Sequence, residues 1–125
     1  MDKDCSHRLP AEWESTGAIL LSWPHSGTDW DYMLDEVTEC FVNIVTEIIK
    51  EEKVIIVAPN VELPQSQLLH LDNSNIYYHT ALTNDTWARD FGPITTIEDG
   101  MFVMHGFQFN GWGLKFSSCY DNLIS

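Results

Sequence analysis

Four side chains that could take part in recognition or catalysis crowd into one short stretch of the sequence. Residues 83–93 read TNDTWARDFGP, so Asp85, Trp87, Arg89 and Asp90 lie within six residues of one another. One interpretation is a turn held by an internal ion pair between Arg89 and Asp90. The other is a pocket for a flat cation, because carboxylates grip such a group through paired hydrogen bonds and an indole attracts positive charge. The residues of this stretch alone leave both interpretations open.

No motif for a metal or a nucleotide appears in the sequence. The three cysteines, Cys5, Cys40 and Cys119, are widely spaced without a CxxC pair, and the five histidines show no HxxxH spacing. No glycine-rich phosphate-binding motif follows an expected strand. We therefore expect no cofactor. Cys40 falls on the apolar face of an expected helix and is predicted to be buried, whereas Cys5 lies in a tail expected to be mobile.

The charge balance limits the classes of partner. The 125 residues carry 19 acids and 6 bases, for a net charge of −13. Nucleic acids and anionic membranes bind basic surfaces, so neither is expected as a partner. The longest apolar runs, such as residues 17–23, are too short to cross a bilayer, and the polar beginning of the chain does not resemble a signal peptide. The sequence predicts a cytoplasmic protein, and a small cationic partner is compatible with its charge.

Hydrophobic patterning predicts an α/β layered domain that positions these residues. Apolar residues recur at helical spacing from Trp30 to Glu51, with Thr28 or Asp29 as the expected cap. Short runs rich in aliphatic and aromatic residues predict strands on either side of this helix. The expected elements are strands at 17–23, 53–59 and 75–80, helices at 30–51 and 64–71, a hairpin of 94–97 and 101–109 around Asp99 and Gly100, and a loop-like end at 110–125.

Four motifs in order resemble the N-terminal part of one enzyme family. They are LPAEWES (9–15), LLSWPH (20–25), TNDTWARDFGP (83–93) and FNGWGLKF (109–116). Together they resemble agmatine deiminases and the bacterial, Porphyromonas-type peptidyl-arginine deiminases. The resemblance implies the pentein fold, an α/β-propeller of five ββαβ-type units. Residues 1–125 would then form about one to two of these units, as the N-terminal part of a single domain.

The resemblance also implies a reaction and a role for the loop at 83–93. In the family a cysteine thiolate attacks a guanidinium carbon, ammonia leaves, and water hydrolyses the covalent intermediate. By position in the motif, Asp90 would hold the guanidinium and Trp87 would line the same pocket. Asp85 would brace the turn or touch the ligand, and Arg89 would tie the loop to the scaffold.

The remaining candidates are weaker. Asn110 and Trp112 resemble family positions near the distal end of the substrate, and the absence of arginine at 110–115 favours agmatine over a substrate with a carboxylate. Trp23 resembles a position near the pocket mouth, although a buried strand end explains it equally well. His25 is interpreted as a loop histidine rather than a catalyst.

Where the sequence departs from the family, it lacks the catalytic groups. The nucleophilic cysteine, the catalytic histidine and a second guanidinium-binding carboxylate are expected beyond residue 125. We therefore expect a chain that supplies only the guanidinium-binding wall of an agmatine deiminase, which converts agmatine to N-carbamoylputrescine in putrescine biosynthesis. A homo-oligomer is possible. The alternatives are a peptidyl-arginine deiminase and a non-catalytic small α/β protein that binds a guanidinium or a polyamine.

Overall fold

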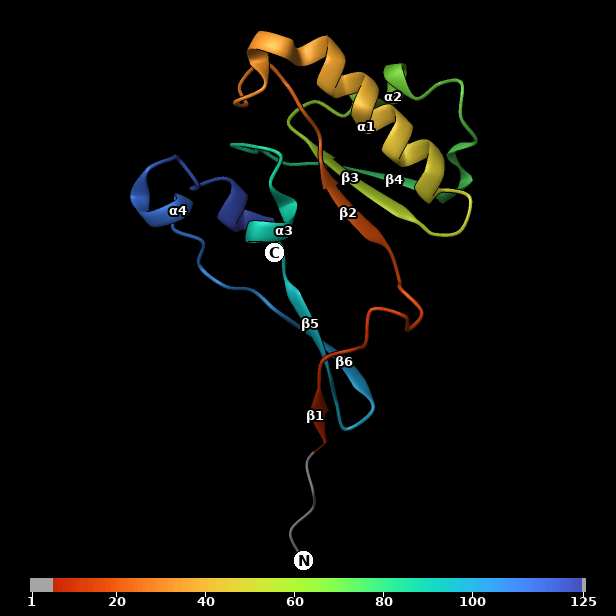
Figure 1. The fold of residues 1–125 in the computed structure, drawn as a ribbon, viewed down its shortest axis with the longest axis vertical. Helices are drawn as coiled ribbons and strands as arrows, with labels where there is room; N and C mark the ends of the chain where they lie inside the picture. Colours follow the sequence, from red (N-terminus) through yellow and green to blue (C-terminus); the bar gives the residue numbers. More distant parts are fainter. Residues whose placement is uncertain (1–5, 125) are drawn as a thin grey trace, which may run out of the picture.

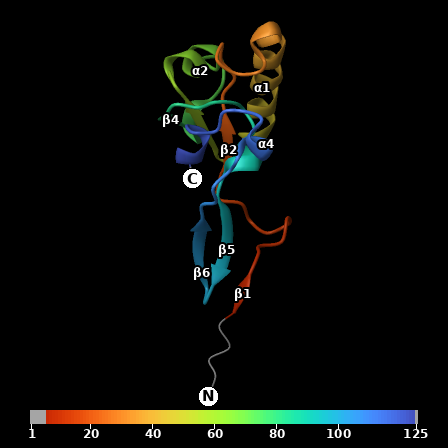
Figure 2. The ribbon, with the colours of Figure 1, turned by 90° about the vertical axis from the view of Figure 1, so that its left-hand side faces the viewer.

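Two three-stranded sheets organise the chain in the computed structural model, which describes residues 6–124 (Figure 1). The first sheet is parallel, in the order β2-β3-β4, and the second has the order β1-β5-β6. The helices α1 and α2 lie beside the parallel sheet, whereas the hairpin β5–β6 extends away from it (Figure 2). The mixed α/β class predicted from the sequence is confirmed.

The parallel sheet consists of β2 (Ile19–Ser22), β3 (Val54–Ala58) and β4 (Ile76–Thr80). These strands lie inside the predicted ranges, and β3 is central, pairing Leu21 with Ile56 on one side and Ile56 with Tyr78 on the other. Alternate residues of β3 point to one face, where they join Trp23, Val45, Leu68 and Ile76 in the core. The core therefore lies between this face of the sheet, α1 and the end of α2.

The long helix is shorter than the periodicity predicts. Its first turn is a 3-10 helix (Asp31–Met33), followed by α1 (Leu34–Ile48), and neither Thr28 nor Asp29 caps it. Thr28 instead donates its hydroxyl to the carbonyl of His25, at 2.7 Å. The prediction that Cys40 is buried is wrong: its side chain is exposed. The helix packs against the core of the sheet through Phe41, Val42, Val45, Ile48 and Ile49, which leaves Cys40 and Ile44 outside this stripe.

The second sheet contains the predicted hairpin and one strand that the sequence did not indicate. Strands β5 (Ile94–Glu98) and β6 (Met101–His105) are joined by Asp99 and Gly100, both with positive φ, as a tight hairpin turn requires. β6 ends four residues before the predicted strand. The missed strand, β1 (His7–Arg8), has two exposed polar residues and pairs with β5 through backbone hydrogen bonds.

Helix α2 (Glu62–Gln67) begins two residues before the predicted helix and ends four residues before it does. Short turns occupy the stretches predicted as loops: a 3-10 turn spans Asn73–Asn75, and α3 (Ala88–Phe91) is a single turn. At the end of the chain lie α4 (Gly111–Leu114) and a 3-10 turn (Asp121–Leu123). Within residues 6–124, no helix is long and apolar enough to span a bilayer.

Candidate functional site

The loop after β4 meets the loop after β2 at one edge of the parallel sheet. Parallel strands bring their carboxyl ends to the same edge, so residues separated by about sixty positions become neighbours. Ser22 donates its hydroxyl to the carbonyl of Asp85 at 2.6 Å, and the His25 ring lies 2.9 Å from the Thr83 hydroxyl. Gly27 N–H donates to His25 Nδ1, so in the neutral ring Nε2 carries the hydrogen and donates to Thr83.

Two carboxylates are buried here, Asp85 in the loop itself and Asp121 near the end of the chain. Asp85 accepts from the backbone N–H of Thr86 at 2.8 Å, and Asp121 accepts from the backbone N–H groups of Asn84 and Asp85 at 2.7 and 3.4 Å. Burial raises the pKa of both carboxyl groups, and the backbone donors act in the opposite direction. Asp85 is therefore placed to brace the loop, which is one of its two expected roles, and it has little surface for a ligand.

Burial acts on His25 with the opposite sign. It lowers the pKa of the imidazole, and the contact with Thr83 and the charges of Asp85 and Asp121 only partly oppose this. Burial therefore favours the neutral form of the ring, which links two loops at the edge of the sheet. This placement agrees with the interpretation of His25 as a loop histidine.

Six aromatic rings form one cluster, named here the aromatic cluster. They belong to Trp30, Phe91, Phe109 and Phe116 and to the two candidates Trp87 and Trp112. The Trp87 ring lies 5.7 Å from that of Trp30 and 6.3 Å from that of Trp112, and Trp112 contacts Phe109 edge-on at 4.8 Å. Trp87 and Trp112 remain 41% and 38% exposed, so each presents a ring surface to solvent. Aromatic faces arranged in this way can contact an alkyl chain or a cation.

Asp90 differs from the two buried carboxylates. It lies on α3, is exposed, and its side chain makes no hydrogen bond or ion pair with any residue between 6 and 124. Its backbone N–H donates to the carbonyl of Trp87 at 2.9 Å, which connects it to the aromatic cluster. Together with Arg89, Phe109 and Asn110 it lines a recess of about 300 Å³.

The structure corrects two interpretations of Arg89. It forms no ion pair with Asp90, so the simple internal Arg–Asp turn is not present. Nor does Arg89 tie the loop to the scaffold, because its exposed side chain has no hydrogen-bond or ion-pair partner in the described part of the chain. The loop is held by Ser22, Asn84 and Asp121 instead.

Asn110 supports an unusual turn that carries Trp112. Residues 111–114 all have positive φ, from 57° at Trp112 to 80° at Gly113, so α4 is a left-handed turn. The Asn110 side chain accepts from the N–H of Gly113 at 2.9 Å and stabilises this turn. A Cβ at Gly111 would collide with the Phe116 carbonyl oxygen, which explains glycine at that position. Asn110 also borders the recess beside Asp90.

Trp23 lies apart from this group. Its side chain is 0% exposed, its indole N–H donates to Gln67 at 2.8 Å, and its ring packs edge-on against Phe41. The interpretation as a buried strand end therefore describes Trp23, and the structure does not support a place at a pocket mouth.

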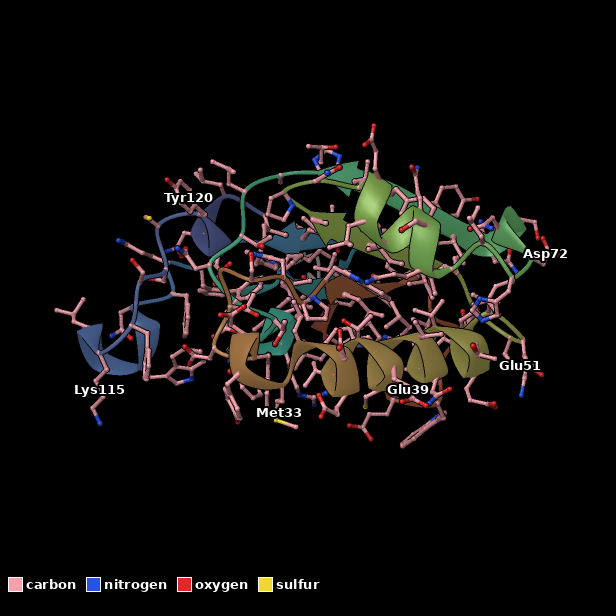
Figure 3. The ribbon with its side chains drawn as sticks, turned by 90° about the horizontal axis from the view of Figure 1, so that it is seen from above. Met33, Glu39, Glu51, Asp72, Lys115 and Tyr120 are labelled. Carbon is pink, nitrogen blue, oxygen red and sulfur yellow. The ribbon has the colours of Figure 1, made fainter. Side chains whose placement is uncertain are left out.

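Sequence reasoning missed Trp30, Asn84 and Asp121. Trp30 donates its indole N–H to the Thr86 hydroxyl at 2.9 Å, and Asn84 accepts from the N–H groups of Tyr120 and Asp121 at 2.8 and 3.2 Å. The only available signal was a tryptophan in an otherwise polar loop. Figure 3, which looks along the long axis, shows Lys115 and Tyr120 on the opposite side of the molecule from Glu51 and Asp72.

No catalytic cysteine is assembled in the described residues. Cys40 and Cys119 are free and exposed, and neither thiol is hydrogen-bonded to a histidine or carboxylate of residues 6–124. Cys5 lies outside the described residues. Between residues 6 and 124, no three histidine, cysteine or acidic side chains are grouped to hold a metal ion. A larger open hollow, of about 600 Å³, lies on the outer face of α1, away from the aromatic cluster.

Comparison with solved structures places this arrangement among deiminases. A cysteine-to-serine variant of agmatine deiminase from C. jejuni, with substrate bound, matches with a TM-score of 0.89 and 32% identity, covering 98% of this chain and 36% of that one. A Porphyromonas gingivalis protein, provisionally named arginine deiminase, matches with a TM-score of 0.84 and 43% identity, covering 95% of this chain and 35% of that one.

Sequence comparison agrees. Agmatine deiminase of Pseudomonas aeruginosa is 29% identical over 107 residues, which are 85% of this chain and 29% of that protein. The chain thus spans about a third of the length of its relatives. The family model of the Porphyromonas-type peptidyl-arginine deiminases matches residues 8–125. The chain belongs to the Porphyromonas-type peptidyl-arginine deiminase family, which includes agmatine deiminases.

Proposed function

We propose that this chain supplies the guanidinium-binding wall of a guanidine deiminase whose substrate is agmatine. The observation that carries the proposal is Asp90: an exposed carboxylate, without a partner among residues 6–124, beside a recess and next to the aromatic cluster. A planar guanidinium can donate two hydrogen bonds to such a carboxylate, while Trp87 and Trp112 contact the aliphatic chain. The net charge of −13 favours the approach of a dication.

The proposed reaction converts agmatine to N-carbamoylputrescine and ammonia. A cysteine thiolate attacks the guanidinium carbon, a C–N bond breaks, and ammonia leaves with a proton from a histidine. Water then breaks the C–S bond, giving the ureido product and restoring the thiolate. Asp90 orients the carbon toward the thiolate. The cysteine, the histidine and a second carboxylate are proposed to lie outside this chain, in a pentein domain of which it forms about one to two units.

Two features bear on the choice of substrate. Residues 110–115 contain no arginine to receive the carboxylate of a C-terminal arginine, and a carboxylate desolvated without a partner is costly. This favours agmatine, which has no carboxylate. The name of the family supports peptidyl-arginine as the second candidate.

Paired kinetics on the native-length protein test the proposal. Agmatine and a peptide with a C-terminal arginine are compared in one assay for the ureido product. We expect kcat/KM to be at least about tenfold higher for agmatine, equivalent to roughly 1.4 kcal/mol. Comparable values for both substrates contradict the preference. Agmatine binding without any turnover would instead indicate the third candidate, a non-catalytic guanidinium- or polyamine-binding protein.

The cytoplasmic location, the role in putrescine formation and a homo-oligomeric assembly remain predictions. Light scattering on the native-length protein tests the assembly.

A further inference from the structure

Two neighbouring residues near the end of the chain contact both sides of the candidate site. Asp121 and Asn122 lie on the 3-10 turn that follows residues 118–120. The side chain of Asp121 binds the loop that leads to Trp87, and the side chain of Asn122 binds the backbone that leads to Trp112. These contacts join segments separated by 37 and 13 residues in the sequence.

The first connection is reciprocal. One oxygen of Asp121, Oδ1, accepts from the backbone N–H groups of Asn84 and Asp85, and Asn84 Oδ1 accepts from those of Tyr120 and Asp121. Asp121 is 1% exposed, so these hydrogen bonds are shielded from water. Trp87 follows two residues after Asp85, and α3, which carries Asp90, packs directly against the same 3-10 turn.

The second connection satisfies both backbone groups of one residue. Asn122 Oδ1 accepts from the Phe109 N–H at 2.7 Å, and its Nδ2 donates to the carbonyls of Phe109 and Ser118 at 2.8 and 2.9 Å. The Phe109 ring contacts both Trp112 and Phe91. Asn122 therefore holds the backbone of Phe109, two residues before the left-handed turn begins at Gly111.

We propose that Asp121 and Asn122 are positioning residues that hold the two walls of the site at a set separation, one wall carrying Trp87 and Asp90 and the other carrying Trp112. Because the two side chains are adjacent on one turn, each fixes the position of one wall relative to that same turn. The 6.3 Å contact between Trp87 and Trp112 is the distance that this arrangement sets. The kinetic consequence depends on the proposed deiminase function; the structural one does not.

Steady-state kinetics with agmatine on the native-length protein test the kinetic consequence. Asp121→Ala releases the loop that leads to Asp90, so we expect kcat to fall by about tenfold or more, because reacting groups misplaced by about 1 Å react far more slowly. Asn122→Ala releases the wall that carries Trp112, so we expect KM to rise by about tenfold with kcat changed by less than about threefold.

Three variants separate positioning from charge and from folding. Asp121→Asn keeps Oδ1 as the acceptor and should stay within about threefold of the unsubstituted protein in kcat. Asn43→Ala, on the exposed face of α1, is the matched control for Asn122→Ala and should change neither constant. If Asn122→Ala does not fold, Asn122→Asp replaces it: it keeps the acceptor for the Phe109 N–H but loses both N–H donors, and KM should rise.

Hydrogen exchange measured by NMR provides the readout that is independent of activity. Asp121→Ala should accelerate exchange at the amides of Asn84 and Asp85 by about tenfold or more and leave the amide of Phe109 unchanged. Asn122→Ala should accelerate exchange at the amide of Phe109 and leave those of Asn84 and Asp85 unchanged. Three results would overturn the proposal: exchange unchanged in both alanine variants, Asp121→Asn as damaging as Asp121→Ala, or an equal loss of kcat with unchanged KM in both alanine variants. Absence of turnover in the unsubstituted protein refutes the proposed function instead, and the exchange data still decide the positioning.

Discussion

Replacing Asp90 by asparagine removes the charge proposed to hold the guanidinium. Asparagine keeps one carbonyl oxygen, so the side chain loses its charge and one of two acceptors while its shape is preserved. In the free protein Asp90 is exposed, but a substrate that fills the recess of about 300 Å³ excludes water from the pair. Losing one partner of such an interaction costs roughly 2–5 kcal/mol. With a tenfold change per 1.36 kcal/mol, kcat/KM for agmatine should fall by about 30-fold to about 5,000-fold.

The same substitution should leave the fold unchanged. Asp90 has no ion pair or side-chain hydrogen bond with residues 6–124, so we expect the free energy of unfolding to change by less than about 0.5 kcal/mol. The assay measures ureido product on the native-length protein, with thermal unfolding of the same sample. Asp35→Asn, which removes one exposed charge from α1, is the matched control and should retain normal kinetics. A kcat/KM for Asp90→Asn within threefold of the unsubstituted protein would refute the role of Asp90.

Three further predictions concern the turn, the pH dependence and the isolated chain. Gly111→Ala should lower the free energy of unfolding by at least about 1–3 kcal/mol because of the left-handed backbone, and by more because its Cβ would collide with the Phe116 carbonyl. Gly113→Ala, with φ of +80° and free space around the Cβ, should lower it by less. Denaturant unfolding compares the two variants, and equal losses would contradict the collision. Burial lowers the pKa of His25 below its ordinary 6.5, so its contribution to stability is present above pH 6.5 and is lost as the pH falls through the lowered value. The pKa values of Asp85 and Asp121 are raised, so these groups contribute with the opposite sign at more acidic pH. His25→Gln should therefore lose less stability than the unsubstituted protein between pH 7.5 and 5.5, and thermal melting with the same pH dependence in both proteins would contradict this. The isolated 125-residue chain should show no deiminase turnover, and turnover in a product assay would contradict this. The same chain should self-associate, because Met101, Phe102 and Met104 are exposed on the hairpin. A monodisperse monomer in light scattering would contradict the second expectation.

The strands and the long helix could be predicted because their patterns are local. β3 consists of β-branched and small apolar residues, and the stripe at Phe41, Val45 and Ile48 has helical spacing. The same pattern could not show how wide the packed stripe is, so Cys40 was wrongly assigned to the core. β1 was missed because its pairing with β5 is a property of the backbone, and its two residues are polar and exposed.

The candidate site was predictable where one motif contains it and hidden where distant segments build it. Trp87 and Asp90 lie in one stretch of sequence, and the structure connects them through a single backbone hydrogen bond. The side chains that hydrogen-bond to the loop come from distant parts of the chain: Trp30 is 56 residues from Thr86, and Asp121 is 37 residues from Asn84. Nor does the sequence show that residues 111–114 are left-handed, because glycine is compatible with either hand of turn.

A crystal structure of the native-length protein with agmatine bound tests the central claim most directly. The C. jejuni structure contains a cysteine-to-serine variant with substrate bound, and the same replacement at the proposed nucleophilic cysteine is expected to hold agmatine in place. The proposal predicts that two guanidinium nitrogens lie within about 3 Å of the Asp90 carboxylate oxygens, with the alkyl chain against Trp87 and Trp112. A guanidinium bound elsewhere, with Asp90 paired to a side chain of the protein, would contradict it.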